Sequence, residues 1–181
     1  TPTLPTITAQ TNFTSQNWGT SASQTSAGVT SITLTASNTG STWYALNSRS
    51  LSRNFDKNAA SSIGATNRTC SIWSTSGTCN ITTPTITAAS GYTQQGWGTA
   101  TSSTSKTVAA NTSMTLNNST TGGKYYAIQS KTVTITYAGN GSTSGSTTSQ
   151  TCTMYNANKT CSITLNSNGF TKTNYTFTGW G

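Results

Sequence analysis

An internal repeat constrains the fold of this chain more than any other feature of its sequence. Cys152 follows Cys70 at the same distance along the chain as Cys161 follows Cys79. Other matching positions keep this spacing or nearly so: Phe55 and Tyr137, Tyr44 and Tyr126, the Pro-Thr-Ile-Thr-Ala segments at 5–9 and 84–88, and the Trp-Gly pairs at Trp18, Trp97 and Trp180. Because self-similarity at a fixed period marks repeated structural units, this agreement predicts tandem modules of about 82 residues.

The repeat divides the sequence into one whole copy and two partial copies. Residues 49–130 form the complete repeat, residues 1–48 match the second half of a repeat, and residues 131–181 match the first half of a following repeat. Two explanations remain open. The sequence is a window on a longer repetitive polypeptide, or residues 131–181 of one subunit are completed by residues 1–48 of the next in head-to-tail assembly.

Short runs of alternating apolar and polar residues indicate strands throughout the repeat. Val133, Ile135 and Tyr137 alternate with Thr, and a turn-forming segment rich in Gly, Asn and Ser follows at 139–142. No segment carries the apolar period of an amphipathic helix, which is about 3.6 residues. The pattern therefore predicts an all-β fold.

The composition favours a folded chain over a flexible stalk, although only 31% of the residues are hydrophobic. Disordered segments are usually poor in aromatic residues and rich in charge, whereas this chain is 9% aromatic and 6% charged. Its many Thr residues suit a pleated surface, on which the methyl group packs and the hydroxyl faces water. We expect β modules with thin cores.

The four cysteines predict two local disulfides. Four cysteines allow three pairings, but the repeat symmetry favours Cys70 with Cys79 and Cys152 with Cys161. In the chain-entropy model, closing so short a loop stabilises the fold by roughly 2–3 kcal/mol. The alternative is a metal site, but this spacing without His or a neighbouring acid fits no zinc pattern.

A recurring aromatic motif precedes each Trp-Gly pair and is typical of a core segment. We expect the largest core side chains of the repeats to be the following: Trp18, Tyr44, Tyr92, Trp97, Tyr126, Tyr175 and Trp180. Gly96 and Gly179 would let the backbone turn or pack closely before the Trp. The alternative is that Tyr92 and Trp97 stack on sugar rings at a carbohydrate-binding surface.

The segment Asn174-Tyr-Thr-Phe-Thr-Gly-Trp180 resembles the Gly-Tyr-Thr-Phe-x-Gly-Trp signature of the Listeria–Bacteroides (internalin B-type) repeats of bacterial surface proteins. Segment 91–97 keeps this pattern, and segment 135–141 is similar to the family's opening strand and turn. The resemblance implies a small β-grasp-like module that occurs in strings, as stalks, adhesive segments or partner-binding units. This chain departs from the family in its longer period and in its Cys pair.

The charged and titratable residues exclude several functional classes. Because the chain has no His and a single acid, Asp56, it lacks paired carboxylates, a Ser-His-Asp triad and a His- or Asp-based metal cluster. We therefore expect no enzymatic activity, no cofactor and no metal. The net charge of +8 comes from scattered Lys and Arg residues, which argues against nucleic-acid recognition. No apolar stretch is long enough for membrane insertion.

These features predict a structural subunit or segment of an extracellular bacterial filament, stalk or cell-surface fibre that assembles with itself. The expected disulfides favour an extracellular or cell-surface location, and Thr1 is then expected to begin a processed or excised piece. The main alternative is an adhesin module that binds glycans or a protein partner on another cell. An ice-binding surface is disfavoured, because the Thr-x-Thr runs are few.

Overall fold

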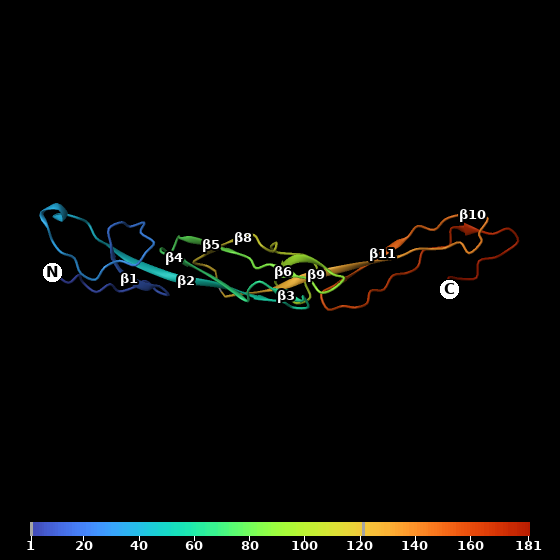
Figure 1. Ribbon diagram of the computed structural model, residues 1–181, viewed down its shortest axis with the longest axis horizontal. Coiled ribbons are helices and arrows are strands. Elements are labelled where there is room, and N and C mark those ends of the chain that lie inside the picture. Colours follow the sequence, from blue (N-terminus) through green and yellow to red (C-terminus); the bar gives the residue numbers. More distant parts are fainter. Residues whose placement is uncertain (1, 121) are drawn as a thin grey trace. The chain divides into compact units, whose positions relative to one another are not determined.

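The structure is a computed structural model and describes residues 2–120 and 122–181. Strands dominate these residues, and their single helical element is the 3-10 turn η1 (Ala36–Asn38) (Figure 1). The strands are β1 (Thr14–Gly19), β2 (Tyr44–Asp56), β3 (Ser62–Ile63), β4 (Asn67–Ile72), β5 (Thr78–Thr82), β6 (Ile86–Thr87), β7 (Thr93–Gly98), β8 (Ser113–Asn117), β9 (Lys124–Ile135), β10 (Ser144–Gly145), β11 (Gln150–Tyr155) and β12 (Phe170–Thr171). The predicted all-β class is confirmed. Within the described residues, no helix has the length and hydropathy needed to cross a membrane.

The chain forms two compact units, and each is assembled from separate stretches of sequence. Unit 1 contains Thr1–Asp56, Gly64–Thr85 and Ala110–Tyr125. Unit 2 contains Lys57–Ile63, Ile86–Ala109 and Tyr126–Gly181. Each unit draws on more than one predicted repeat, so a string of independently folding modules, divided at 48 and 130, stays a prediction.

In unit 1, β2 is the central strand of an antiparallel sheet. Its first half pairs with β1, where Trp18 lies opposite Ala45. Its second half pairs with β4, where Leu51 lies opposite Cys70. A separate antiparallel ladder joins β5 to β8. The buried apolar side chains of these strands are Leu46, Leu51, Phe55, Ile72, Ile81 and Leu116.

In unit 2, β9 is the central strand in the same way. It pairs with β7, where Trp97 lies opposite Ala127, and with β11, where Val133 lies opposite Cys152. Two short ladders complete this unit, one between β3 and β6 and one between β10 and β12. Its buried apolar side chains are Ala60, Trp97, Ala127, Ile128 and Met154.

The strand pairings recur with the period of the sequence. Leu51 lies opposite Cys70 in unit 1, and Val133 lies opposite Cys152 in unit 2. Both partners of the second pair lie one sequence period after those of the first. The neighbouring pairs of these two ladders follow the same rule. The sequence period therefore corresponds to a recurring arrangement of paired strands.

Both predicted repeat boundaries fall inside strands rather than between them. The boundary after residue 48 lies within β2, and the boundary after residue 130 lies within β9. Residues 44–48 of β2 pair with β1, whereas its later residues pair with β4. The same strand therefore ends one repeat of the sequence and begins the next.

A residue with left-handed backbone directly precedes the Trp in all three copies of the aromatic motif. These residues are Asn17, with φ 66°, Gly96, with φ 117°, and Gly179, with φ 151°. At Gly96 the register between β7 and β9 shifts, and a Cβ atom there would lie 2.7 Å from the Val108 carbonyl oxygen. Because only Gly fits such an approach, Gly96 creates a bulge that sets the direction of the Trp97 side chain.

The two partial repeats overlap in content. Segments 1–19 and 162–181 both correspond to the part of the complete repeat that ends at Gly98, and each ends in a Trp-Gly pair. Residues 1–48 and 131–181 together therefore contain more than one repeat. A module completed from both would leave part of one of these two segments outside it.

Candidate functional site

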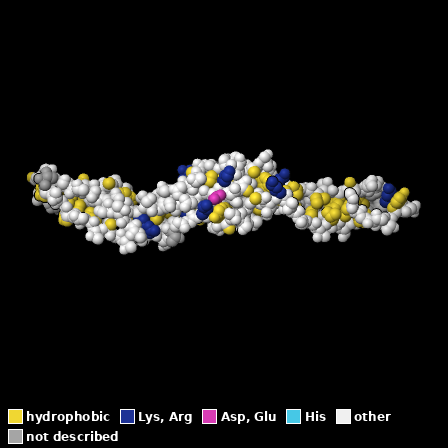
Figure 2. Space-filling view, turned by 90° about the horizontal axis from the view of Figure 1, so that it is seen from below, with side chains coloured by type: hydrophobic (Ala, Val, Ile, Leu, Met, Phe, Trp, Pro, Cys, Tyr) yellow, Lys and Arg dark blue, Asp and Glu magenta, His cyan; other side chains and the backbone are white. Residues whose placement is uncertain are grey.

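Asp56, the one acid of the chain, forms an ion pair with Lys124 at the surface. Lys124 Nζ donates a hydrogen bond to Asp56 Oδ2 at 3.1 Å, and Figure 2 shows the acidic side chain beside a basic one. Both side chains are partly exposed, so the pair contributes about 0–1 kcal/mol. Within the described part of the chain, no three His, Cys, Asp or Glu side chains gather where they could hold a metal ion.

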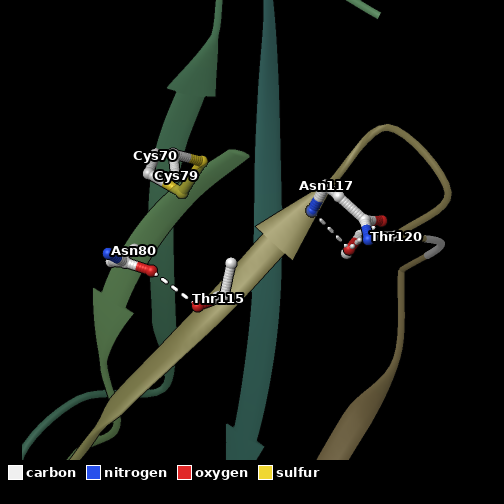
Figure 3. Close-up of a disulfide and its surroundings, with 6 residues drawn as sticks. All are labelled: Cys70, Cys79, Asn80, Thr115, Asn117 and Thr120. Carbon is white, nitrogen blue, oxygen red and sulfur yellow. Dashed lines mark hydrogen bonds between the residues drawn. A yellow bond between two sulfur atoms is a disulfide. The ribbon is translucent and has the colours of Figure 1, made fainter. Parts of the chain in front are cut away.

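Both predicted disulfides are present. Cys70–Cys79 links β4 to β5, with a Cα–Cα distance of 6.0 Å (Figure 3). Cys152–Cys161 links β11 to the segment 160–164, with a Cα–Cα distance of 6.2 Å. In both cases the bond fixes the segment that follows the Cys-containing strand to the sheet. All four cysteines are used.

Two Trp residues occupy matching places in the two units. Trp97 is 0% exposed, and its backbone N–H donates to the Val108 carbonyl at 2.8 Å. The Trp18 backbone N–H donates to the Val29 carbonyl at 3.1 Å, and its indole N–H donates to the Pro5 carbonyl at 2.7 Å. Trp97 is therefore a core residue, and its ring is inaccessible for stacking on a sugar.

The other aromatic residues expected in the core are less buried. Trp18, Tyr92, Tyr126 and Trp180 are half-buried rather than buried, and the Tyr92 hydroxyl donates to the Asn158 carbonyl at 3.1 Å. Tyr44 is 38% and Tyr175 is 71% exposed, which differs from the core positions expected for both. In the described chain no strand pairs with residues 172–181.

An open groove of about 760 Å³ lies beside the last aromatic motif in unit 2. The Trp180 ring packs against Tyr137 and Phe177, with ring centroids 4.5 and 5.1 Å apart. Lys172 Nζ lies 4.5 Å from the centroid of the exposed Tyr175 ring. Exposed aromatic faces beside polar groups can stack on the apolar face of a ring-shaped ligand.

A buried amide network in unit 2 was not predicted from the sequence. Gln129 is fully buried, its Nε2 donates to the Ala59 carbonyl at 2.7 Å, and its Oε1 accepts the Ala89 N–H at 2.7 Å. The neighbouring Asn156 is also buried and donates from Nδ2 to the Thr101 carbonyl at 3.0 Å. The network ties three loops to β9. The one sign of this network in the sequence is that Gln129 directly follows two apolar residues, Ala127 and Ile128.

Asn47 corresponds to Gln129, which lies one sequence period later. Its side-chain Oδ1 is buried in unit 1 and has no hydrogen-bond partner among residues 2–120 and 122–181. Leaving a buried acceptor unpaired costs about 1–3 kcal/mol. The side-chain oxygen at this repeat position therefore accepts a hydrogen bond in unit 2 and has no partner among the described residues in unit 1.

No protein-family model, no curated protein and no solved structure matches this chain. The similarity of segment 174–180 to the Listeria–Bacteroides repeats therefore stays a prediction. What the chain does has to be inferred from its strand pairing, its disulfides and its exposed groups.

The local cysteine pairing predicts the tryptic peptides of the unreduced protein. Trypsin should release 69–106, which contains Cys70 and Cys79, as one peptide that is lighter by its two thiol hydrogens. Peptide 132–159 should stay joined to 160–172 through Cys152 and Cys161 until a reductant is added. Mass spectrometry measures both, with reduced and alkylated protein as the control. A bond from 69–106 to either other peptide would contradict local pairing.

Proposed function

We propose that the chain is a structural segment of an extracellular bacterial filament, stalk or cell-surface fibre. The observation that carries this proposal is that β2 pairs with β1 through its first half and with β4 through its second half. In unit 2, β9 pairs with β7 and β11 in the same manner. A strand that belongs to two consecutive repeats joins them through continuous backbone, without a flexible linker that would extend under tension.

The disulfides support both the extracellular location and the structural role. Such bonds persist in oxidising environments outside the cytosol. Cys70–Cys79 holds the β5–β8 ladder to the β2–β4 ladder, so these ladders cannot be pulled apart without breaking a covalent bond. Covalent links of this kind compensate for the small apolar core of so short a repeat.

The low charge supports self-assembly. Only 6% of the residues are charged, and the excess of +8 is distributed over nine Lys and Arg residues and one acid. Figure 2 shows basic side chains at separate places on the visible face. Because the basic groups are few and scattered, strand edges can meet away from them, and salt screens the repulsion that the net charge of +8 produces between copies.

The proposal predicts where the protein is found on the cells that make it. Gold-labelled antibody raised against the purified chain should decorate surface fibres on unpermeabilised cells in the electron microscope. Deletion of the gene should remove both the label and the fibres. Label confined to the cytoplasm of permeabilised cells, or protein dispersed in the medium without fibres, would contradict the fibre function.

A second candidate function is an adhesin module that binds glycans, and the groove beside Tyr175 favours it. Tyr175 and Phe177 are among the most exposed large side chains of the chain, and both line the groove together with Trp180. Sugars commonly stack their apolar ring faces on aromatic side chains of this kind. In this candidate function the glycan binds at the last aromatic motif, and Trp97 is not part of the binding site because it is buried.

The adhesin candidate predicts that Tyr175→Ala lowers the affinity for a bound neutral glycan by roughly tenfold, which equals about 1.4 kcal/mol. Tyr44→Ala is the matched control, because Tyr44 is an exposed tyrosine in unit 1. A glycan array followed by calorimetry on the hits measures the effect. An array without hits, or an equal loss in both variants, would exclude this site.

A further inference from the structure

Two arginines lie directly opposite each other in the β2–β4 ladder of unit 1. Arg53 of β2 is the register partner of Arg68 of β4. Opposing residues of an antiparallel pair project from the same face of the sheet, with Cβ atoms about 4.5–5.5 Å apart. Because like charges at this separation repel each other, the pair concentrates positive charge at one point of the ladder.

The neighbours of this pair on the same face are apolar and buried. Leu51, two residues before Arg53, and Phe55, two residues after it, are each 3% exposed, and alternate residues of a strand share a face. Arg53 is half-buried, and Arg68 is exposed. Charges beside buried apolar groups are screened less than charges on an open surface. The pair is therefore a favourable place for a negatively charged group that arrives from the solvent.

The single acid of the chain cannot balance the positive charge of this region. Asp56 accepts a hydrogen bond from Lys124 Nζ at 3.1 Å. Arg53, Arg68 and Lys124 carry three positive charges against the one negative charge of Asp56. However the Asp56 carboxylate is shared among them, two positive charges remain in excess. An anion that balances them comes from outside the chain.

The fold does not require arginine at these two positions. One sequence period later, the same cross-strand pair is formed by Ile135 and Gln150 in the β9–β11 ladder. Gln150 Nε2 donates to the Thr164 carbonyl at 2.9 Å. Because uncharged side chains hold this place in unit 2, the strands pair without the two positive charges. The arginines of unit 1 therefore indicate a role in binding rather than in strand pairing.

We propose that Arg53 and Arg68 together bind a carboxylate or phosphate group of an anionic polysaccharide outside the cell. The planar guanidinium group presents its N–H donors as a fork that fits two oxygen atoms of such a group. Two forks on one face of a sheet can hold one oxyanion between them. The inference rests on the proposed extracellular location and adds a partner to the proposed fibre.

The distribution of charge favours a polysaccharide over a membrane or a nucleic acid. Anionic lipid surfaces attract clusters of about four to eight Lys and Arg residues, and nucleic acids attract a basic patch or stripe. The nine basic residues of this chain are scattered along the sequence, and one opposed pair can bind one separate oxyanion. Acidic polysaccharides carry such groups at intervals along a backbone of uncharged hydroxyl groups.

Replacing both arginines with the residues of the last partial repeat tests the site in the full 181-residue chain. Arg53→Ile with Arg68→Gln should keep the circular dichroism of the unmodified protein, because Ile135 and Gln150 form the same pair in unit 2. Biolayer interferometry should show roughly tenfold weaker binding to an acidic polysaccharide. Polygalacturonate tests the carboxylate, phosphomannan tests the phosphate, and neutral dextran should bind neither protein.

Lys106→Gln with Lys159→Gln is the matched control, because both lysines are exposed in unit 2. Each double variant removes two of the nine basic groups, so a difference between them reports where the charges lie. The control should bind both polymers like the unmodified chain. Equal losses in the two variants, no binding of the unmodified chain to either acidic polymer, or tighter binding to anionic vesicles or duplex DNA would overturn the proposal.

Nuclear magnetic resonance with inorganic phosphate locates the contact within the chain. The Nε–Hε signals of Arg53 and Arg68 should shift as phosphate is added, because their guanidinium groups would donate to it. The Arg49 signal is the internal control and should stay in place, because Arg49 Nη1 already donates to the Asn118 carbonyl at 2.8 Å. Equal shifts of all three signals would contradict a site at the opposed pair.

The outcomes separate this inference from the function on which it rests. Surface fibres on cells, together with polysaccharide binding that survives the loss of both arginines, would overturn the site and leave the fibre function standing. Binding that depends on Arg53 and Arg68 in a protein that forms no surface fibres would support the site and contradict the fibre function.

Discussion

Backbone hydrogen bonding along β2 and β9 is the interaction on which the rest of this structure depends. Each strand pairs in succession with two shorter strands: β1 then β4 for β2, and β7 then β11 for β9. Separating the partners would leave buried N–H and C=O groups unpaired, which is costly. The repeats of the sequence therefore continue through shared strands, and the compact units do not coincide with single repeats.

Left-handed turn residues, disulfides and a buried hydrogen-bond network stabilise these strands, whose apolar cores are thin. Left-handed residues begin each aromatic motif at Asn12, Gly91 and Asn174, with φ of 66°, 76° and 66°, and these residue types adopt that conformation with little strain. The two disulfides and the Gln129 network then fix segments that bury little apolar surface. Leu34 and Tyr175 are exposed. The matching parts of the complete repeat contain β8 and β7, whereas segments 31–35 and 172–181 form no strand in the described chain.

The sequence predicts local features well and long-range packing poorly. The period, the all-β class and the Cys70–Cys79 and Cys152–Cys161 pairs follow from spacing and residue type, because a repeat imposes the same local geometry on each copy. The exposure of Tyr44 and Tyr175 does not follow, since burial depends on which strand covers a residue. The Gln129 network was missed for the same reason: its partners are loop carbonyls distant in sequence. The sequence also does not predict that β2 pairs with β1 along one half and with β4 along the other, since this depends on which strands meet in space.

Amide hydrogen exchange across the two repeat boundaries tests the central claim most directly. If β2 and β9 are continuous strands shared by consecutive repeats, peptides spanning residues 44–54 and 126–135 should exchange slowly along their whole length, with no fast amides at 48–49 or 130–131. Rapid exchange confined to those positions, as in a linker between separate modules, would contradict the shared-strand account.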